Sequence, residues 1–108
     1  MTVTDTMVQG HGSCHGGYLF TLADSAFAFA CNTYGSATVA AGADIVFVAP
    51  ARSGDELVAE ARERARFGRS GVYDVTVRRT GGDVVAEFRG RARTLNIPLA
   101  MPEDPAHA

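Results

Sequence analysis

One apolar stretch limits what this chain can fold into more than any other part of the sequence. Residues 17–32, GYLFTLADSAFAFACN, carry apolar side chains around almost the whole circumference of a helix, and Asp24 is the one charged residue among them. Glycines precede the stretch and Asn-Thr-Tyr-Gly follows it, which are typical signals for the start and end of a helix. A helix without a polar face is normally buried on all sides, so we expect other elements to surround this one.

The sequence after Gly35 predicts strands. Residues 38–48 are rich in β-branched and aromatic side chains, and residues 71–79 and 83–95 flank a Thr-Gly-Gly turn. Residues 56–67 alternate between apolar and charged side chains; their Ala, Glu and Arg content also suits a helix, but the long alternation favours a strand. The sequence thus predicts an α+β fold in which a curved antiparallel sheet covers one side of the helix and a second subunit the other.

Length and charge exclude several classes of protein. A chain of 108 residues makes one domain, for which self-association is expected. Its 10 basic and 12 acidic residues give a net charge of −2, which predicts neither a nucleic acid nor an anionic membrane as partner. The longest apolar run, interrupted by Asp24, is too short to predict a membrane span. Cys14 and Cys31, without a signal-like start, indicate free thiols in the cytoplasm.

Metals and cofactors have weak support in the sequence. His11, Cys14 and His15 are ligand types, but no fourth partner stands at a usual spacing, so we expect no metal site. No glycine pattern of a phosphate-binding loop or a dinucleotide site occurs, so we expect no cofactor.

The two ends of the chain carry separate expectations. Residues 1–97 are predicted to form the domain, and MTVTD already alternates like a strand at Met1. We therefore expect that part of a first strand is absent from the N-terminus. Residues 98–108 hold three of the four prolines and are predicted to form a disordered tail.

Several phrases of the sequence together resemble one family. GHGSCHGG, LFTLADSAFAFACN, DIVFVAPARSGD, GVYDVTV and VVAEFRGRART are similar to the hotdog-fold acyl-CoA thioesterases of the PaaI type, associated with phenylacetate catabolism. The resemblance implies a curved sheet wrapped around one long central helix, homodimers that pair into homotetramers, and active sites at the dimer interface. It also implies that an N-terminal helix of the family, before the position of Met1, is absent here. It also implies an acyl-CoA substrate of the phenylacetyl or hydroxyphenylacetyl type.

The resemblance implies roles for individual residues. Asp24 matches the family's catalytic carboxylate, and Gly16 supplies the backbone amide that polarises the thioester carbonyl. His15 matches the histidine of the HGG motif. Gln9, six residues before it, stands where the family commonly has an Asn that helps to place water or substrate. The catalytic group is therefore expected to comprise these four residues.

The same resemblance implies where coenzyme A is bound. Its phosphates need cationic side chains at the mouth of the pocket. Arg66, Arg69 and Ser70 in ARFGRSG resemble the loop that binds the nucleotide in this family. We expect these residues, together with Gly17 at the helix start, to contact the substrate.

Thioester chemistry makes the spacing of these residues informative. The amides of Gly16 and Gly17 at a helix N-terminus are expected to be unpaired and to stabilise the charge on the carbonyl oxygen, and Asp24 is expected to act as nucleophile or general base. Eight residues of helix separate Gly16 from Asp24 by about 12 Å, so one carbonyl cannot contact both. Two antiparallel helices would bring Asp24 of one chain opposite Gly16 of the other, which predicts a dimer.

Other interpretations remain open. Asp24 could pair with an arginine of the sheet, and His15 could be an orienting or structural residue instead of a proton-transfer group. The chain could be a non-catalytic acyl-CoA-binding module, which Gln9 and the short N-terminus favour. A hotdog dehydratase would need a catalytic histidine facing an acid, which the HGG-LAD arrangement does not resemble.

Overall fold

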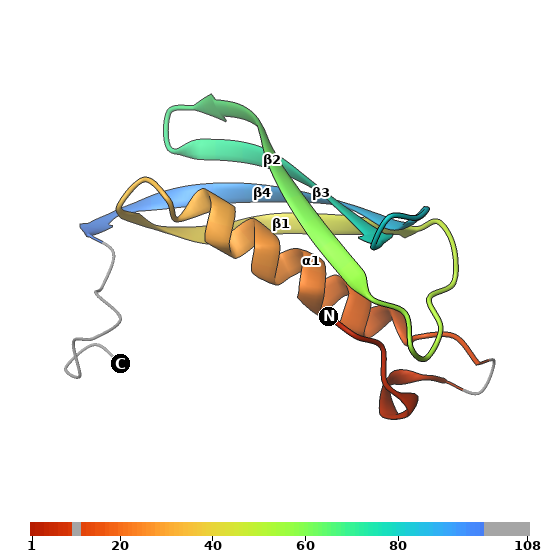
Figure 1. The fold of residues 1–108 in the computed structure, drawn as a ribbon. Coiled ribbons are helices and arrows are strands. Elements are labelled where there is room, and N and C mark those ends of the chain that lie inside the picture. Colours follow the sequence, from red (N-terminus) through yellow and green to blue (C-terminus); the bar gives the residue numbers. More distant parts are fainter. Residues whose placement is uncertain (10–11, 99–108) are drawn as a thin grey trace.

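The fold consists of one long helix and one antiparallel sheet. A computed structural model of the chain describes residues 1–9 and 12–98 (Figure 1). Its elements are a short 3-10 helix η1 (Asp5–Met7), the helix α1 (Gly16–Cys31), and the strands β1 (Ser36–Phe47), β2 (Leu57–Phe67), β3 (Ser70–Arg79) and β4 (Val84–Pro98). These bounds lie within three residues of the predicted ones, and residues 56–67 are confirmed as a strand.

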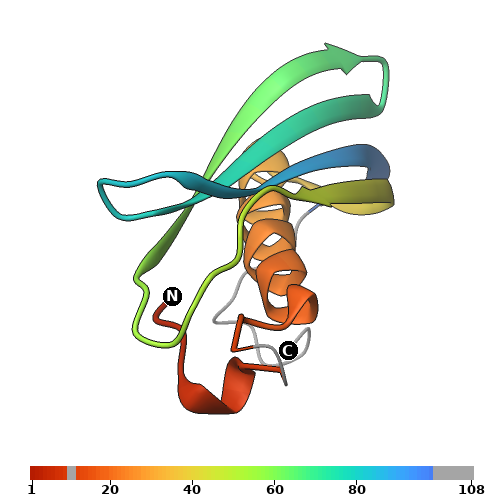
Figure 2. The ribbon, with the colours of Figure 1, turned by 90° about the vertical axis from the view of Figure 1, so that its right-hand side faces the viewer.

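The sheet arches over the helix. Its strand order is β1-β4-β3-β2, and every neighbouring pair is antiparallel. Figure 2 shows the strands curving around one side of α1, and the helix contacts all four of them. The predicted curved sheet around a central helix is therefore confirmed.

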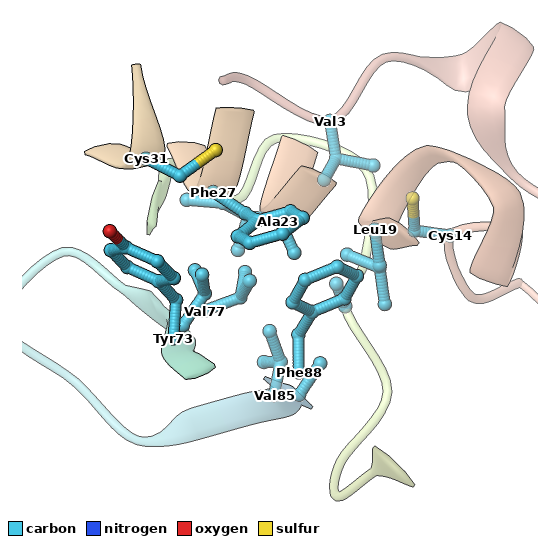
Figure 3. Packing of buried hydrophobic residues seen from close by; sticks show 14 of the residues in the cluster. Val3, Cys14, Leu19, Ala23, Phe27, Cys31, Tyr73, Val77, Val85 and Phe88 are labelled. Carbon is cyan, nitrogen blue, oxygen red and sulfur yellow. The ribbon is translucent and has the colours of Figure 1, made fainter. Parts of the chain in front are cut away.

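The core lies between α1 and the concave face of the sheet. Leu19, Ala23, Phe27 and Cys31 recur at every fourth position and form the buried stripe of the helix. Figure 3 shows Phe27 between Tyr73 and Phe88, with ring centroids 5.7 Å away in each case. Burial of each large side chain in this layer stabilises the fold by about 2 kcal/mol.

Gly90 of β4 makes this packing possible. A β-carbon at position 90 would lie 2.7 Å from three atoms of the Phe27 ring, which is closer than packed carbon atoms approach one another. The ring therefore rests directly on the backbone of the strand.

One side of the helix is uncovered in a single chain. Tyr18, Phe20 and Phe29 are 42%, 36% and 79% exposed. The sheet covers one side of α1, and among the described residues no other element covers the opposite side. The apolar circumference thus leaves an uncovered surface of the kind for which a second subunit was predicted.

The outer face of the sheet carries cross-strand ion pairs. Asp74 accepts hydrogen bonds from Arg89 at 2.6 and 2.9 Å, and Arg91 lies 2.9 Å from Asp44. The Arg89 guanidinium holds the pKa of the Asp74 carboxyl below its usual range. The sheet therefore has one apolar and one polar face, as its alternation predicted.

The chain ends differ in part from expectation. MTVTD does not form a strand: Thr2 makes a single bridge with Glu56, and η1 follows. The backbone of Val3 bonds the turn before β2, Thr4 is still extended, and η1 begins at Asp5. Pro98, predicted to begin the tail, is the last residue of β4, and residues 99–108 lie outside the described part of the chain.

Candidate active site

The start of α1 is capped by His15. This residue has extended backbone angles, and its Nδ1 accepts a hydrogen bond of 3.0 Å from the Gly17 N–H. The first amides of a helix lack acceptors within the helix, so a side-chain acceptor at the preceding position satisfies one of them. An Nδ1 that accepts a bond holds no proton, which favours the orienting role of His15 over proton transfer.

The two glycine amides differ in their partners. The Gly17 N–H is occupied by His15, so the expectation that both amides are unpaired is wrong for this one. Within residues 1–9 and 12–98, the Gly16 N–H has no hydrogen-bond acceptor. Gly16 therefore presents a donor at the positive end of the helix dipole, where a developing negative charge is stabilised.

A pocket of ≈ 560 Å³ opens beside this amide. It brings together four of the predicted site residues, Gln9, His15, Gly16 and Gly17. Ser13 holds Gln9 there by two hydrogen bonds. The Gln9 side-chain Nε2 donates to the Ser13 hydroxyl at 3.4 Å, and the Gln9 backbone N–H donates to the Ser13 carbonyl at 2.9 Å. The sequence analysis missed the opposite wall of the pocket, residues 47–51. The alternation of side chains along a strand does not show where the segment after that strand lies relative to the helix.

Asp24 lies two turns along the helix and does not line this pocket. Its side chain is half-buried, and among the described residues its carboxylate has neither an ion pair nor a hydrogen bond. The alternative in which an arginine of the sheet pairs with Asp24 is therefore wrong for this structure. A half-buried carboxylate without a partner among the described residues is available to a ligand or a second chain.

Gly16, Phe20 and Asp24 share one stripe of α1, because they follow at intervals of four residues. Phe20 contacts Phe88 edge to face with ring centroids 5.3 Å apart, and the Phe47 ring of β1 lies against Gly16. We call these three residues the Gly16–Asp24 stripe; its first two members contact the end of β1 and Phe88 of β4.

The predicted coenzyme A residues lie near the other end of α1. Arg66 ends close to the last turn: its guanidinium carbon is 3.6 Å from the centroid of the Tyr34 ring. The segment is not a loop, because Arg66 belongs to β2 and Ser70 to β3, with a two-residue turn between Phe67 and Ser70. In one chain, then, these residues do not meet the pocket at Gly16.

A hydroxyl cluster beside this turn was missed by the sequence analysis. Glu63 accepts hydrogen bonds from Tyr34 at 2.7 Å and from Tyr73 at 3.0 Å. Burial, followed by the bond to Glu63, raises the pKa of Tyr73 to about 12. The three residues lie far apart in the sequence, so only the pairing of β2 with β3 and the end of the helix brings them together.

Both cysteines are buried free thiols, as predicted, and burial raises the pKa of each. Within residues 1–9 and 12–98 no three His, Cys, Asp or Glu side chains gather in a way that could hold a metal ion. His11, one of the three ligand types considered, lies outside the described residues. The helices that the structure describes include none with both the length and the hydrophobicity of a membrane span.

Comparison with known proteins gives the family. The model of the thioesterase superfamily matches residues 11–86, which include the capped helix and most of the sheet. The chain belongs to the thioesterase superfamily. It is 52% identical over 77 residues to the acyl-coenzyme A thioesterase PaaI of Escherichia coli K12, an alignment that covers 71% of this chain and 55% of that protein.

Two solved structures agree with the fold. The structure of E. coli PaaI, from the phenylacetic acid degradation operon, superposes with a TM-score of 0.89 and 45% identity over 93% of this chain and 72% of that one. A Streptococcus mutans protein bound to acetyl CoA superposes with a TM-score of 0.85 and 25% identity over 92% of this chain and 80% of that one. The predicted hotdog fold is confirmed, although this thioesterase-superfamily chain spans about half the length of the curated relatives it matches.

Proposed function

We propose that the protein hydrolyses acyl-CoA thioesters to a free acid and coenzyme A. The observation that carries this proposal is the Gly16 amide, a donor at a helix N-terminus that faces a ≈ 560 Å³ pocket, on one stripe with the half-buried carboxylate of Asp24. A donor for the carbonyl oxygen and a carboxylate for attack are the two groups that thioester hydrolysis needs.

The two groups complete a site only when two chains associate. Along one helix they are about 12 Å apart, which exceeds the size of a thioester group. An antiparallel pair of helices that brings Gly16 opposite the partner's Asp24 has Phe20 at its two-fold axis and generates two equal sites. The exposed Phe20 and the exposed Phe47 at the end of β1 support this interface. We propose a homodimer, with pairing of dimers into a tetramer.

In this dimer each group has a defined role. The Gly16 N–H donates to the carbonyl oxygen as negative charge develops there, and the thiolate of coenzyme A leaves. Asp24 either attacks the carbonyl carbon, forming an anhydride that water then cleaves, or removes a proton from the attacking water. His15 orients the helix start through its bond to Gly17, and Gln9 positions water or substrate at the pocket rim.

Coenzyme A would be held by residues from the end of the opposite helix. Antiparallel helices bring the Arg66–Ser70 turn of one chain toward the pocket of the other. Arg66 already stacks on Tyr34 and lies 3.9 Å from Glu63, whereas the exposed Arg69 has no ion pair among the described residues. We therefore assign the main phosphate contact to Arg69, with Arg66 and Ser70 beside it.

The acyl group proposed is phenylacetyl or hydroxyphenylacetyl. The support is the similarity to PaaI of E. coli, a protein from the phenylacetic acid degradation operon. A cytoplasmic location fits a coenzyme A ester as substrate and the two free thiols.

Thiol release from a panel of acyl-CoA esters tests the proposal. We expect turnover of phenylacetyl-CoA by the purified chain, and a loss of about 10²- to 10⁴-fold in Asp24→Asn with an unchanged melting temperature. Asp44→Asn, which removes an exposed carboxylate of the outer face, is the matched control and should keep full activity. Full activity of Asp24→Asn would exclude the assigned role.

A non-catalytic acyl-CoA-binding module is the second candidate. One observation favours it: Gln9 stands where the family commonly has an Asn. Calorimetric binding of acyl-CoA esters without release of thiol would select this function over hydrolysis.

A further inference from the structure

The position of Phe47 against the Gly16 amide goes beyond the roles assigned so far. Phe47 is the last residue of β1, and its ring lies directly on Gly16. A β-carbon at Gly16 would be 2.6 Å from Phe47 Cζ and 3.0 and 3.2 Å from the two Cε atoms. The edge of the ring therefore occupies the space that a side chain at position 16 would fill.

Phe47 is also part of the pocket wall. It is 55% exposed although it is a large apolar side chain, and it lines the ≈ 560 Å³ pocket together with Leu19 and the short side chains of residues 48–51. Within the described lining it is the bulkiest apolar group. A flat, accessible ring beside an amide donor is the type of surface that holds an apolar group attached to a carbonyl.

The chemistry of the substrate gives this ring a specific neighbour. If the Gly16 N–H donates to the thioester oxygen, the first carbon of the acyl group lies one bond from the carbonyl carbon, and so beside Phe47. An aryl group one methylene away can stack offset against the ring, whereas a flexible alkyl chain loses rotational freedom in the same position.

We infer that Phe47 determines which acyl groups the enzyme accepts and that it favours aryl-acetyl over straight-chain esters. This inference rests on the proposed thioesterase function. It differs from the roles of Asp24 and Gly16 because it concerns the ratio between substrates, and Phe47 takes no part in the proton or acyl transfer.

The test compares two substitutions at Phe47 with one at a matched residue. The selectivity is the kcat/KM for phenylacetyl-CoA divided by that for hexanoyl-CoA. We expect Phe47→Ala to lower it about tenfold and Phe47→Leu to lower it less, since contacts of this size discriminate by factors of roughly 10 to 200. The control is Val58→Ala, because Val58 is also an apolar strand residue and is 38% exposed but belongs neither to the pocket lining nor to the Arg66–Ser70 turn.

The outcomes separate this inference from the function on which it rests. Equal losses for both esters in Phe47→Ala, or an equal shift in Val58→Ala, would overturn the role of Phe47 while hydrolysis stands. Absence of turnover with every ester in the unsubstituted chain would overturn the hydrolase instead. In that case the ratio of the dissociation constants for the same two esters, measured by calorimetry, tests Phe47 with the same expected direction.

Discussion

The two ends of helix α1 are built in opposite ways. At the N-terminal end, the Gly16 amide has no acceptor among the described residues and faces a pocket. At the C-terminal end, Asn32 satisfies the backbone: its side-chain amide donates to Ala28 O at 2.8 Å and to Thr38 O at 3.1 Å, and its Oδ1 accepts from the Thr38 N–H at 2.9 Å. One end keeps a donor for a ligand, and the other end uses its polar groups to join the helix to β1.

The difference in hydrogen bonding predicts which helix end affects activity and which affects stability. A helix end with a donor left over can bind a ligand but gains nothing from that donor in the free protein, whereas a satisfied end stabilises the fold. Substitutions at the first end should therefore change activity at nearly constant stability. Substitutions at the second should change stability at nearly constant activity.

The largest effect is expected from Gly16→Val. Its side chain would displace the Phe47 ring and obstruct the approach of a carbonyl to the amide, so kcat/KM for phenylacetyl-CoA should fall about 100-fold, as for the loss of an oxyanion donor. The melting temperature should change little, since Phe47 is half-exposed and can move. Steady-state kinetics and thermal unfolding measure the two, and a stability loss without an activity loss would break the comparison.

The next effect concerns Tyr73 and pH. Its pKa of about 12 in the folded protein exceeds the value of about 10 for an unfolded tyrosine, so the unfolded chain loses this proton first as the pH rises. The contribution is fully present below pH 10 and is lost between pH 10 and 12, up to about 2–3 kcal/mol. Urea unfolding at pH 9 and 11 should show this loss, and Tyr73→Phe should show a shallower one; parallel curves would contradict it.

A smaller loss of stability is expected from Asn32→Ala. The substitution removes the side-chain bonds to Ala28 and Thr38, which should lower the free energy of unfolding by about 1–2 kcal/mol. Activity per folded molecule should not change. Thr33→Ala, which removes one hydroxyl bond to Ala30 on the same turn, is the milder control. A fall in kcat with unchanged stability would show that this end also serves the reaction.

The smallest effect is expected from a substitution in the Arg66–Ser70 turn, near the C-terminal end of α1. Arg69→Ala should raise KM for phenylacetyl-CoA about fivefold, because one charge-assisted contact to a phosphate is lost. It should leave the KM for the same acyl group on N-acetylcysteamine, which has no phosphate, unchanged. Equal changes in both KM values would argue against a phosphate contact.

Much of the fold followed from local patterns. The apolar run of residues 17–32 and the alternation of residues 56–67 predicted a helix and a strand, because side-chain periodicity directly reflects the face that an element buries. The sequence did not show which residues form the uncovered side of α1, because the apolar pattern is the same whether the chain's own sheet or a second chain covers a residue.

The candidate site was predictable only in part. Gln9, His15, Gly16 and Gly17 are close in sequence, and the structure brings them into one pocket. The wall formed by Phe47 depends on where β1 ends relative to the helix start, which no short sequence pattern encodes. The same limit applies to the turn at Arg66. This turn lies near the C-terminal end of α1 because β2 pairs with β3, and no short sequence pattern predicts that position.

The contact between Phe27 and Gly90 has a consequence for how this sequence can vary. Because the ring occupies the place of a β-carbon on β4, neither position can change freely while the other stays the same. A larger residue at 90 requires a smaller one at 27, and a smaller residue at 27 alone leaves a void beside Tyr73 and Phe88. We therefore expect positions 27 and 90 to change together among related sequences, although 63 positions separate them along the chain.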